Sequence, residues 1–550
     1  MTQKNCNQCK TQFEITDADR AVYKQWEVPE PALCSMCRQK ARIIFRNFKT
    51  LYSRTSDKSG KPLISAYAPD ALCVVWDTDE WWADDWDDLA HGRDIDFTKP
   101  FFPQIGELMK MQPRFSIMNV NSENCKFSNM TVRSKNCYMV FGCVDDEDCY
   151  YGHIVWDSVD CMDALYAYKC QLCYECIDTV NCYNCTWCQE CENCNYSMAC
   201  FECTNCENCI GCVGLRDKQY HIFNKPVSKE EYLAFSKNLN WCDPKAVVDI
   251  FKKRDELKKQ IPRRAFHGSR AEDVSGEHLY NCKDVHDAFD VKDSENCKHL
   301  YTAKNFKDAY DISFTVYGEL QYNSLTCGGK GSGYSIIGSH SCFNCSFTSY
   351  ADQCFSSNNI FGCVGLKKKE YCILNKQYSK ADYLTLVEKL KKHMQKTGEW
   401  GLFFPRELSP FAYNESIINE YHPLKREEAL ALGYRWRDSI PRTRGKETID
   451  AGALPHDISK VPDTITHEIL SCEECGNNYK VITQEVNFLK RQELPLPRAC
   501  FDCRHSRRMR SRDKRILEKR ACSVCDVAVN TTYRETEQPL MCESCYWKRV

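Results

Sequence analysis

Twelve of the 40 cysteines in this 550-residue chain fall into three sets whose spacing is typical of metal sites. In each set one CxxC pair is followed, after 16 or 24 residues, by a second CxxC pair. Two thiolates on one tight turn can reach the same ion, and two such turns complete a tetrahedral site of four sulfur ligands. Because four protein ligands leave no open position, the spacing predicts about three structural Zn²⁺ ions per chain. The predicted ligands are Cys6, Cys9, Cys34 and Cys37, then Cys472, Cys475, Cys500 and Cys503, then Cys522, Cys525, Cys542 and Cys545.

The first two sets resemble each other beyond their cysteines. A Pro-x-Pro sequence precedes the second CxxC in both, at Pro29 and at Pro495. In both, the second CxxC runs directly into a basic segment without proline or glycine. We therefore expect a helix that begins at the metal, as in treble-clef zinc fingers.

The basic segments after Cys37 and Cys503 carry clustered arginines. A zinc module with an arginine-rich helix can bind the phosphate backbone of RNA, and the simpler alternative is a solvated helix face. Recurrence at both ends of the chain favours binding of RNA or a ribonucleoprotein. The predicted contacts are Arg38, Arg42, Arg46, Arg504, Arg507, Arg508, Arg510 and Arg512.

The middle of the chain has a strict repeat. All 18 cysteines from Cys125 to Cys212 lie at positions that leave remainder two on division by three, and many are 12 residues apart. A period of 12 does not fit a helical repeat, whereas stacked β-coils place equivalent residues about 4.8 Å apart. The pattern predicts a β-solenoid with an inward column of cysteines. The coil length stays open between 12 and a multiple of 12, and Asn and Asp before the cysteines are expected at turns.

The solenoid is duplicated at an offset of 151 residues, because the segment from Asn208 matches the segment from Asn359. The second copy keeps the triplet register with fewer cysteines, so larger residues such as Phe306, Tyr310 and Phe314 are expected to replace them. Capping boxes at Ser228 and Ser379 predict a helix that seals the end of each solenoid.

Three interpretations of the solenoid cysteines remain: buried packing, bound metal and redox chemistry. The CxxCxxC triplets resemble ferredoxin ligands, but the register continues as a period and the terminal Cys-Pro is absent, which favours packing. Nine acids and four tryptophans lie between Trp76 and Asp96. They predict an acidic strap that docks on a basic neighbour such as the Arg38 helix, with a sugar-binding cleft as the alternative. The chain has no HExxH, GxSxG, CxxCH or GxGxxG motif, so nothing in it argues positively for an enzyme.

These features predict a mainly β protein with two cysteine-rich solenoids flanked by small treble-clef or zinc-ribbon modules. The expected segments are a zinc ribbon with basic helix (1–56), an acidic Trp-rich connector (57–114), solenoid 1 with its helix (115–240), a helical linker (241–269), solenoid 2 with its helix (270–396), an extended strap (397–465), a second ribbon with basic helix (466–520) and a four-cysteine ribbon (521–550).

The chain resembles a family of zinc-ribbon proteins from very small bacteria, sometimes labelled the Caib/baif family. The resemblance covers nearly the whole chain and includes the first CxxC set, RNFKTLYSR, WWADDWD, DIDFTKPFFPQ, the NCY repeats, SPFAYNES and PLPRACFDCR. The two large ribbons resemble the treble-clef family, and the last 29 residues resemble small CxxC…CxxC ribbons. The resemblance implies zinc binding and a cytoplasmic location, and it implies no particular activity.

Charge and cysteine usage limit the function classes. Lys plus Arg number 74 and Asp plus Glu 76, so nucleic-acid affinity would have to come from local patches. No apolar leader or membrane span is evident, and free cysteines fit a reducing, cytoplasmic location. The leading hypothesis is a non-enzymatic zinc-binding scaffold that contacts RNA through its ends and protein partners through its solenoids, in an undetermined oligomeric state. The alternatives are a multi-metal or redox protein and a β-helix enzyme acting on polysaccharide.

Overall fold

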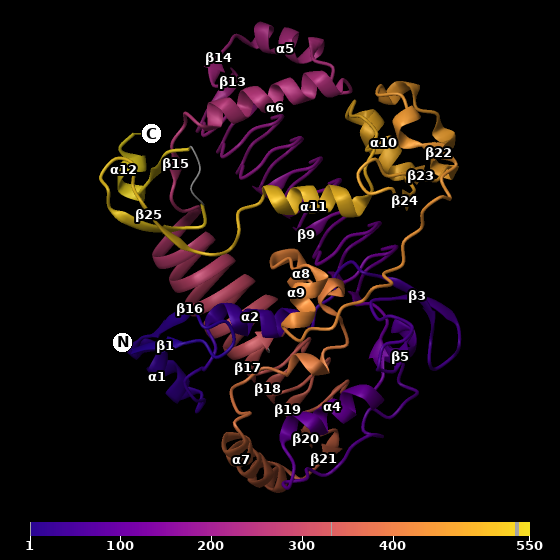
Figure 1. Ribbon diagram of the computed structural model, residues 1–550, viewed down its shortest axis with the longest axis vertical. Coiled ribbons are helices and arrows are strands. Elements are labelled where there is room, and N and C mark those ends of the chain that lie inside the picture. The colour runs from indigo at the N-terminus through magenta and orange to yellow at the C-terminus, as the bar shows by residue number, and fades with distance from the viewer. Residues whose placement is uncertain (1, 332, 534–537, 550) are drawn as a thin grey trace.

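The computed structural model describes residues 2–331, 333–533 and 538–549. It is a mainly β protein built on two solenoids, with small helical modules packed along them (Figure 1). Solenoid 1 runs through the upper half of the view to β13, and solenoid 2 runs from β16 to β20 in the lower half (Figure 1). The predicted fold class is therefore correct.

Solenoid 1 has the shortest coil that the sequence pattern allowed. Parallel bridges recur at about every third residue and join it to the residue 12 positions later, as in Lys126 with Tyr138 and Tyr138 with Tyr150. The longer stretches of the ladder form short strands. They are β7 (Asn119–Val120), β8 (Thr131–Val132), β9 (His153–Trp156), β10 (Leu165–Tyr168), β11 (Ile177–Val180), β12 (Glu207–Ile210) and β13 (Gln219–Ile222). The ladder ends there, because β14 (Lys225–Pro226) pairs antiparallel with β13.

The triplet repeat has a backbone cause. From Asn121 to Phe223 every third residue has a positive φ, between 46° and 70°. Each such residue turns the chain by one corner, so four triplets close a four-sided coil. Asn and Asp tolerate this left-handed region better than other non-glycine residues. This explains why Asn124, Asn136 and Asp148 precede the cysteines, as the sequence predicted.

The residue after each corner points into the solenoid. These positions form a continuous core of cysteines with a few valines and alanines, and the cysteines from Cys137 to Cys212 are at most 2% exposed. The predicted inward column, with one cysteine per coil, is confirmed. In that column Ser197, where the cysteine is interrupted, is also fully buried.

Solenoid 2 follows the same rule with larger fillers. Its strands are β16 (Gly268–Leu325), β17 (Tyr334–Ile337), β18 (Ser346–Ser349), β19 (Asn358–Phe361), β20 (Glu370–Ile373) and β21 (Lys376–Gln377). Glu319 of β16 pairs with Tyr334 of β17, whereas Tyr334 in turn pairs with Ser346 of β18. The first of these coils therefore contains one triplet more than the next, in the glycine-rich stretch after Cys327.

Phe306 lies inside solenoid 2, as predicted, but Tyr310 and Phe314 do not. Phe314 is itself a corner residue, with φ 53°. Both rings face outward and pack against the N-terminal module, Tyr310 against Tyr23 and Phe314 against Arg46. Aliphatic residues fill most of the interior of the first coils, together with Cys282, Cys297 and Phe306. In the later coils cysteines again make up most of the core, with Ile, Ala and Leu between them.

Helices follow both solenoids where the sequence predicted them. In α5 (Lys229–Asn238), Ser228 Oγ accepts from the N–H of Glu231 at 3.1 Å, and Glu231 accepts from the N–H of Ser228 at 2.8 Å. In α7 (Lys380–Thr397), Ser379 Oγ accepts from the N–H of Asp382. The charged helix α6 (Pro244–Lys258) then leads, through β15 (Arg263–Arg264), into solenoid 2.

The remaining elements are short and lie along the solenoids. The N-terminal part contains β1 (Thr2–Asn5), β2 (Gln12–Ile15), α1 (Asp17–Gln25), α2 (Ser35–Ile43), β3 (Tyr52–Thr55), β4 (Pro62–Ser65), β5 (Val75–Trp76), α3 (Thr78–Trp82), α4 (Phe101–Met111) and β6 (Arg114–Phe115). The strap contains η1 (Arg406–Leu408), η2 (Tyr413–Glu415), α8 (Ile418–Tyr421) and α9 (Arg426–Ala431). The C-terminal part contains β22 (Ile449–Asp450), η3 (Ala451–Ala453), η4 (Ile458–Lys460), η5 (Asp463–His467), β23 (Leu470–Ser471), β24 (Asn478–Tyr479), α10 (Thr483–Arg491), α11 (Phe501–Ser511), β25 (Glu518–Ala521), β26 (Ala528–Thr531), β27 (Leu540–Met541) and α12 (Glu543–Trp547).

Two of these helices lie across the solenoids. Helix α2 contacts β16 of solenoid 2, and α11 contacts β10 of solenoid 1 (Figure 1). Helices α8 and α9 of the strap lie between them in the view (Figure 1). Both α2 and α11 begin at a predicted metal ligand.

Candidate metal centres

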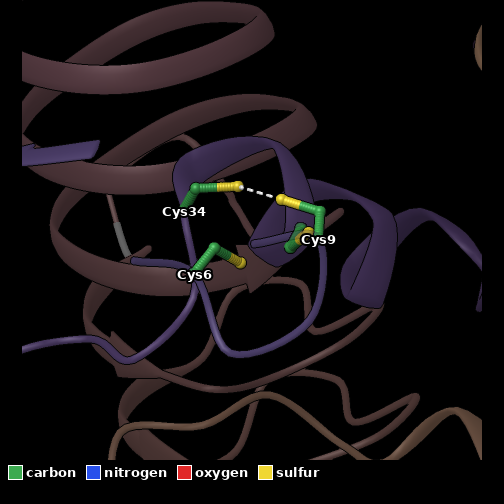
Figure 2. Close-up of side chains that lie close together, drawn as sticks. Cys6, Cys9 and Cys34 are labelled. Atoms are coloured by element: carbon green, nitrogen blue, oxygen red, sulfur yellow. Dashed lines mark hydrogen bonds between the residues drawn. The ribbon is translucent and has the colours of Figure 1, made fainter. Parts of the chain in front are cut away.

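The first cysteine set comes together at the start of α2. Cys6 and Cys9 lie on the turn between β1 and β2, Cys34 is the N-cap of α2, and Cys37 lies in its first turn. The four sulfur atoms lie within 4.8 Å of one another, and the Sγ atoms of Cys9 and Cys34 are 3.6 Å apart (Figure 2). A hydrogen bond from the Cys37 thiol lowers the pKa of Cys34 to about 5, which favours the thiolate that a metal requires.

The second and third sets have the same geometry. Cys500 is the N-cap of α11 and Cys542 is the N-cap of α12. Their sulfur partners lie close, with Cys475 and Cys500 Sγ atoms 3.7 Å apart and Cys525 and Cys542 Sγ atoms 3.7 Å apart. All twelve predicted ligands therefore gather into three groups of four, each able to hold one metal ion.

A shared hydrogen-bond pattern identifies these modules as structural copies. The residue after the first cysteine donates its N–H to the carbonyl two residues before the second pair, from Asn7 to Ala32, Glu473 to Arg498 and Ser523 to Leu540. The residue four positions after the first cysteine takes a positive φ in each module, at Lys10, Gly476 and Asp526.

A fourth module has the same backbone but no cysteine at any of the four ligand positions. Asp57 donates to the carbonyl of Val75, and Gly60 takes the positive φ, as the pattern requires. The four ligand positions are occupied by Ser56, Ser59, Asp77 and Glu80, with Asp77 at the N-cap of α3. The Ser56 hydroxyl donates to the Glu80 carboxylate. In this module a hydrogen bond therefore joins the two halves at the position where the other three modules have their four cysteines. We did not predict this copy from the sequence, although the S-x2-S and D-x2-E spacing was readable.

The arginines predicted to contact nucleic acid after Cys37 are buried, and this prediction is wrong for them. Arg38 Nε donates to Asp311 of β16 at 2.8 Å, and Arg42 Nη1 lies 3.3 Å from the same carboxylate. Arg46 donates to the carbonyl of Phe314 and the hydroxyl of Thr326. The three side chains are at most 6% exposed and hold the N-terminal module on solenoid 2.

The C-terminal arginines divide into two groups. Arg504, Arg508 and Arg512 are at most 7% exposed, so they too cannot reach a phosphate in the folded chain. Arg504 and Arg508 pair with Asp163, whereas Arg512 pairs with Asp178 of solenoid 1 and Asp290 of solenoid 2. The other two predicted contacts, Arg507 and Arg510, are exposed.

The carboxylates that pair with these arginines were not identified from the sequence. Asp163, Asp178, Asp290 and Asp311 all occupy left-handed corner positions. One signal was present in the repeat. Asp178, Glu190 and Glu202 take the same corner in successive coils and therefore stack in one column, where Arg263 pairs with both glutamates.

The solenoid thiols have backbone partners. Cys185 Sγ donates toward the carbonyl of Tyr183 at 3.6 Å and that of Cys194 at 3.3 Å, and the same pattern recurs along the column. Burial raises the pKa of Cys143 well above the usual value, whereas hydrogen bonds from Cys176, Cys185 and other thiols lower the pKa of Cys188 well below it. The backbone partners favour the packing interpretation.

The acidic Trp-rich segment docks on lysines of solenoid 2, such as Lys369 with Asp88 at 3.2 Å, so the predicted docking on a basic neighbour is confirmed. The neighbour is not the Arg38 helix, the example expected from the sequence. Trp81 is fully buried and packs against Phe355. Lys367 Nζ donates to the carbonyl of Ala83 at 2.8 Å and lies over the Trp86 ring. The tryptophans here form a packing contact, which disfavours the sugar-cleft alternative.

No protein-family model and no curated protein matches this chain. Among the residues that the structure describes, none of the helices combines the length and the apolar character needed to cross a membrane.

Proposed function

We propose that the protein is a non-enzymatic scaffold stapled by zinc that presents one basic cavity to RNA. The observation that supports the scaffold is the set of buried ion pairs between the treble-clef modules and the solenoids. Arg512 bridges both solenoids through Asp178 and Asp290, at 2.8 and 2.7 Å, and Arg515 pairs with the same two aspartates at 3.4 and 2.9 Å. Modules held by such ion pairs are not expected to move far relative to the solenoids, and this rigidity suits a scaffold.

Zinc is the metal that best fits the three cysteine groups. Four thiolates in a tetrahedral arrangement suit Zn²⁺, and a closed site of this kind stabilises a fold without catalysing a reaction. Elemental analysis of protein purified without chelator is expected to give at least three zinc ions per chain. A value of one or none would refute this part of the proposal.

RNA contact is assigned to a cavity between α11 and the strap. The cavity has a volume of about 810 Å³, and its lining includes Lys49, Arg442, Arg510 and Lys514. Arg510 and Lys514 are exposed, while Lys49 and Arg442 share Asp502. The cavity thus carries cations that a phosphate backbone can reach, unlike the buried arginines of the same helix.

The test is the salt dependence of binding to single-stranded RNA. Replacing Arg510 and Lys514 by Ser is expected to weaken binding and to reduce the slope of log affinity against log salt by about 1.4, because each phosphate contact on a single strand contributes about 0.7. The matched control replaces Lys380 and Lys396 by Ser, which removes two exposed charges from α7 at the far end of solenoid 2. Equal slopes for the wild type and the cavity variant would refute RNA binding at this cavity.

A further inference from the structure

In addition to the cysteine groups, two histidines and a carboxylate meet at the junction of three distant segments. His153 lies on β9 of solenoid 1, Glu420 on α8 of the strap and His505 on α11 of the second ribbon. One donor atom from each lies within 4.8 Å of the others, and His505 Nε2 is 2.8 Å from Glu420 Oε2. Nothing in the sequence pattern indicated this group, because its members come from separate modules and share no local spacing.

The histidines have polar atoms without partners. His153 is fully buried, and neither of its ring nitrogens has a hydrogen-bond partner in the described part of the chain; the same holds for Nδ1 of His505. Leaving a buried polar group without a partner destabilises the folded state, since the group loses its bonds to water and gains none. Two such imidazoles facing one carboxylate indicate a missing partner.

We propose that His153, Glu420 and His505 bind a divalent transition-metal ion such as Zn²⁺. Two imidazoles and one carboxylate form a ligand set used for zinc with an open position and for non-haem iron. Ligand atoms about 2.0–2.1 Å from an ion lie roughly 3.3 Å from one another, so closing the group by about an ångström completes the set.

The surroundings suit such a site. Glu420 and His505 line the cavity of about 810 Å³, which gives an ion access to water or a small anion for its remaining positions. Asn419, the neighbour of Glu420, lines the same cavity and has a buried Oδ1, unpaired among the described residues, that can orient a bound water.

Nearby cations do not oppose a bound ion strongly, because most have their own carboxylates. Lys49 pairs with Asp502 at 3.0 Å, and Arg508 pairs with Asp163 at 2.7 Å. The ring of Phe48 packs edge-on against His153, with the ring centroids 4.8 Å apart. The Arg46 guanidinium lies over the Phe48 ring, with its Cζ 4.3 Å from the ring centroid.

The test counts metal ions and identifies their ligands in the full chain. Wild-type protein loaded with Zn²⁺ is expected to hold four ions, one more than the cysteine groups can take. Zinc X-ray absorption is expected to show about a quarter nitrogen or oxygen ligands and three quarters sulfur. His153→Phe and Glu420→Gln should each lose one ion and leave an all-sulfur spectrum.

His456→Ala removes an exposed histidine elsewhere and should keep four ions. Circular dichroism and the thiolate-to-metal charge-transfer bands of the cobalt-loaded protein report whether the variants keep their fold and cysteine sites. Three ions with an all-sulfur spectrum in the wild type would overturn the proposal, as would a fourth ion that both variants retain. The wild-type spectrum decides the matter even if a variant misfolds, and neither result depends on RNA binding.

Discussion

Asp311→Asn is expected to loosen the N-terminal metal module from solenoid 2. Asp311 is fully buried and is the only carboxylate within 4 Å of either Arg38 or Arg42 in the described part of the chain. Burial raises the pKa of Asp311, but Arg38 and Arg42 lower it by more than burial raises it, so the pKa lies below the usual value. The pair therefore stabilises the contact above about pH 4, the unfolded pKa, and this stabilisation is lost as the pH falls through the folded pKa.

The magnitude follows from what the substitution leaves behind. Asn has the same shape and tolerates the φ of 60° at this corner, so little backbone strain is added. The loss is the charge, which leaves two buried guanidiniums with only neutral partners. Breaking a buried ion pair in this way costs about 3–5 kcal/mol.

Hydrogen exchange of the α2 amides, followed by mass spectrometry at neutral pH, measures the local opening. Since about 1.4 kcal/mol is a tenfold change, exchange in α2 should speed up by roughly 100-fold or more. Asp308→Asn, at a more exposed corner three residues earlier, is the matched control and should change little. Adding Arg38→Met to Asp311→Asn should recover part of the loss. Unchanged exchange in Asp311→Asn would refute the interpretation that these arginines hold the module.

Three further outcomes are expected. Cys185→Leu should lower the free energy of unfolding, measured by chemical denaturation, by about 2–3 kcal/mol, because the larger side chain would overpack the narrow interior. Cys185→Ser should lower it by only about 1 kcal/mol, because the new hydroxyl can donate to a carbonyl equivalent to the one that accepts from Ser197 Oγ. The pKa of His267 is raised to about 10, because burial lowers it but Glu190, Glu202 and Glu277 raise it by more. The stabilisation that the charged His267 provides is full below about pH 6.5 and is lost as the pH rises through about 10. His267→Gln should therefore flatten the fall in thermal stability between these two pH values, and an equal fall in the wild type and the variant would contradict this. In the fourth module, replacing Ser56, Ser59, Asp77 and Glu80 by cysteine should add one zinc ion per chain, counted by elemental analysis. An unchanged zinc count would show that the geometry of this module does not match that of the cysteine groups.

The parts of this structure that sequence spacing predicts are those with local geometry. Each triplet makes one corner, and each regular coil has four corners. The sequence spacing of the cysteines in one column therefore equals the number of residues per coil. The candidate metal ligands are equally local, because Cys34 and Cys500 each lie at the N-cap of the helix that follows. Both kinds of pattern survive without knowledge of any distant contact.

What the sequence did not reveal is how the modules pack on the solenoids. A helix rich in arginine has the same composition whether it faces water or buried aspartates. The partners of Arg38 and Arg504 lie 273 and 341 residues away, at corner positions that Asp would occupy for backbone reasons alone. The charge pattern therefore predicted a solvent-exposed binding face, and the packing turned that face inward.

The corner at every third residue also restricts how such a chain can change in length. At the start of solenoid 2, before the regular coils, the corners at Asp273 and His278 are five residues apart. Inserting one or two residues into a regular coil would move every later side chain from the interior to the surface or to a corner, whereas inserting three preserves the phase. The enlarged coil of solenoid 2 contains one such added triplet, and the ladder resumes its usual register immediately afterwards. In a gene that encodes this fold, tolerated insertions and deletions should therefore come in steps of nine nucleotides, and grafted loops should be accepted at the corners in that unit.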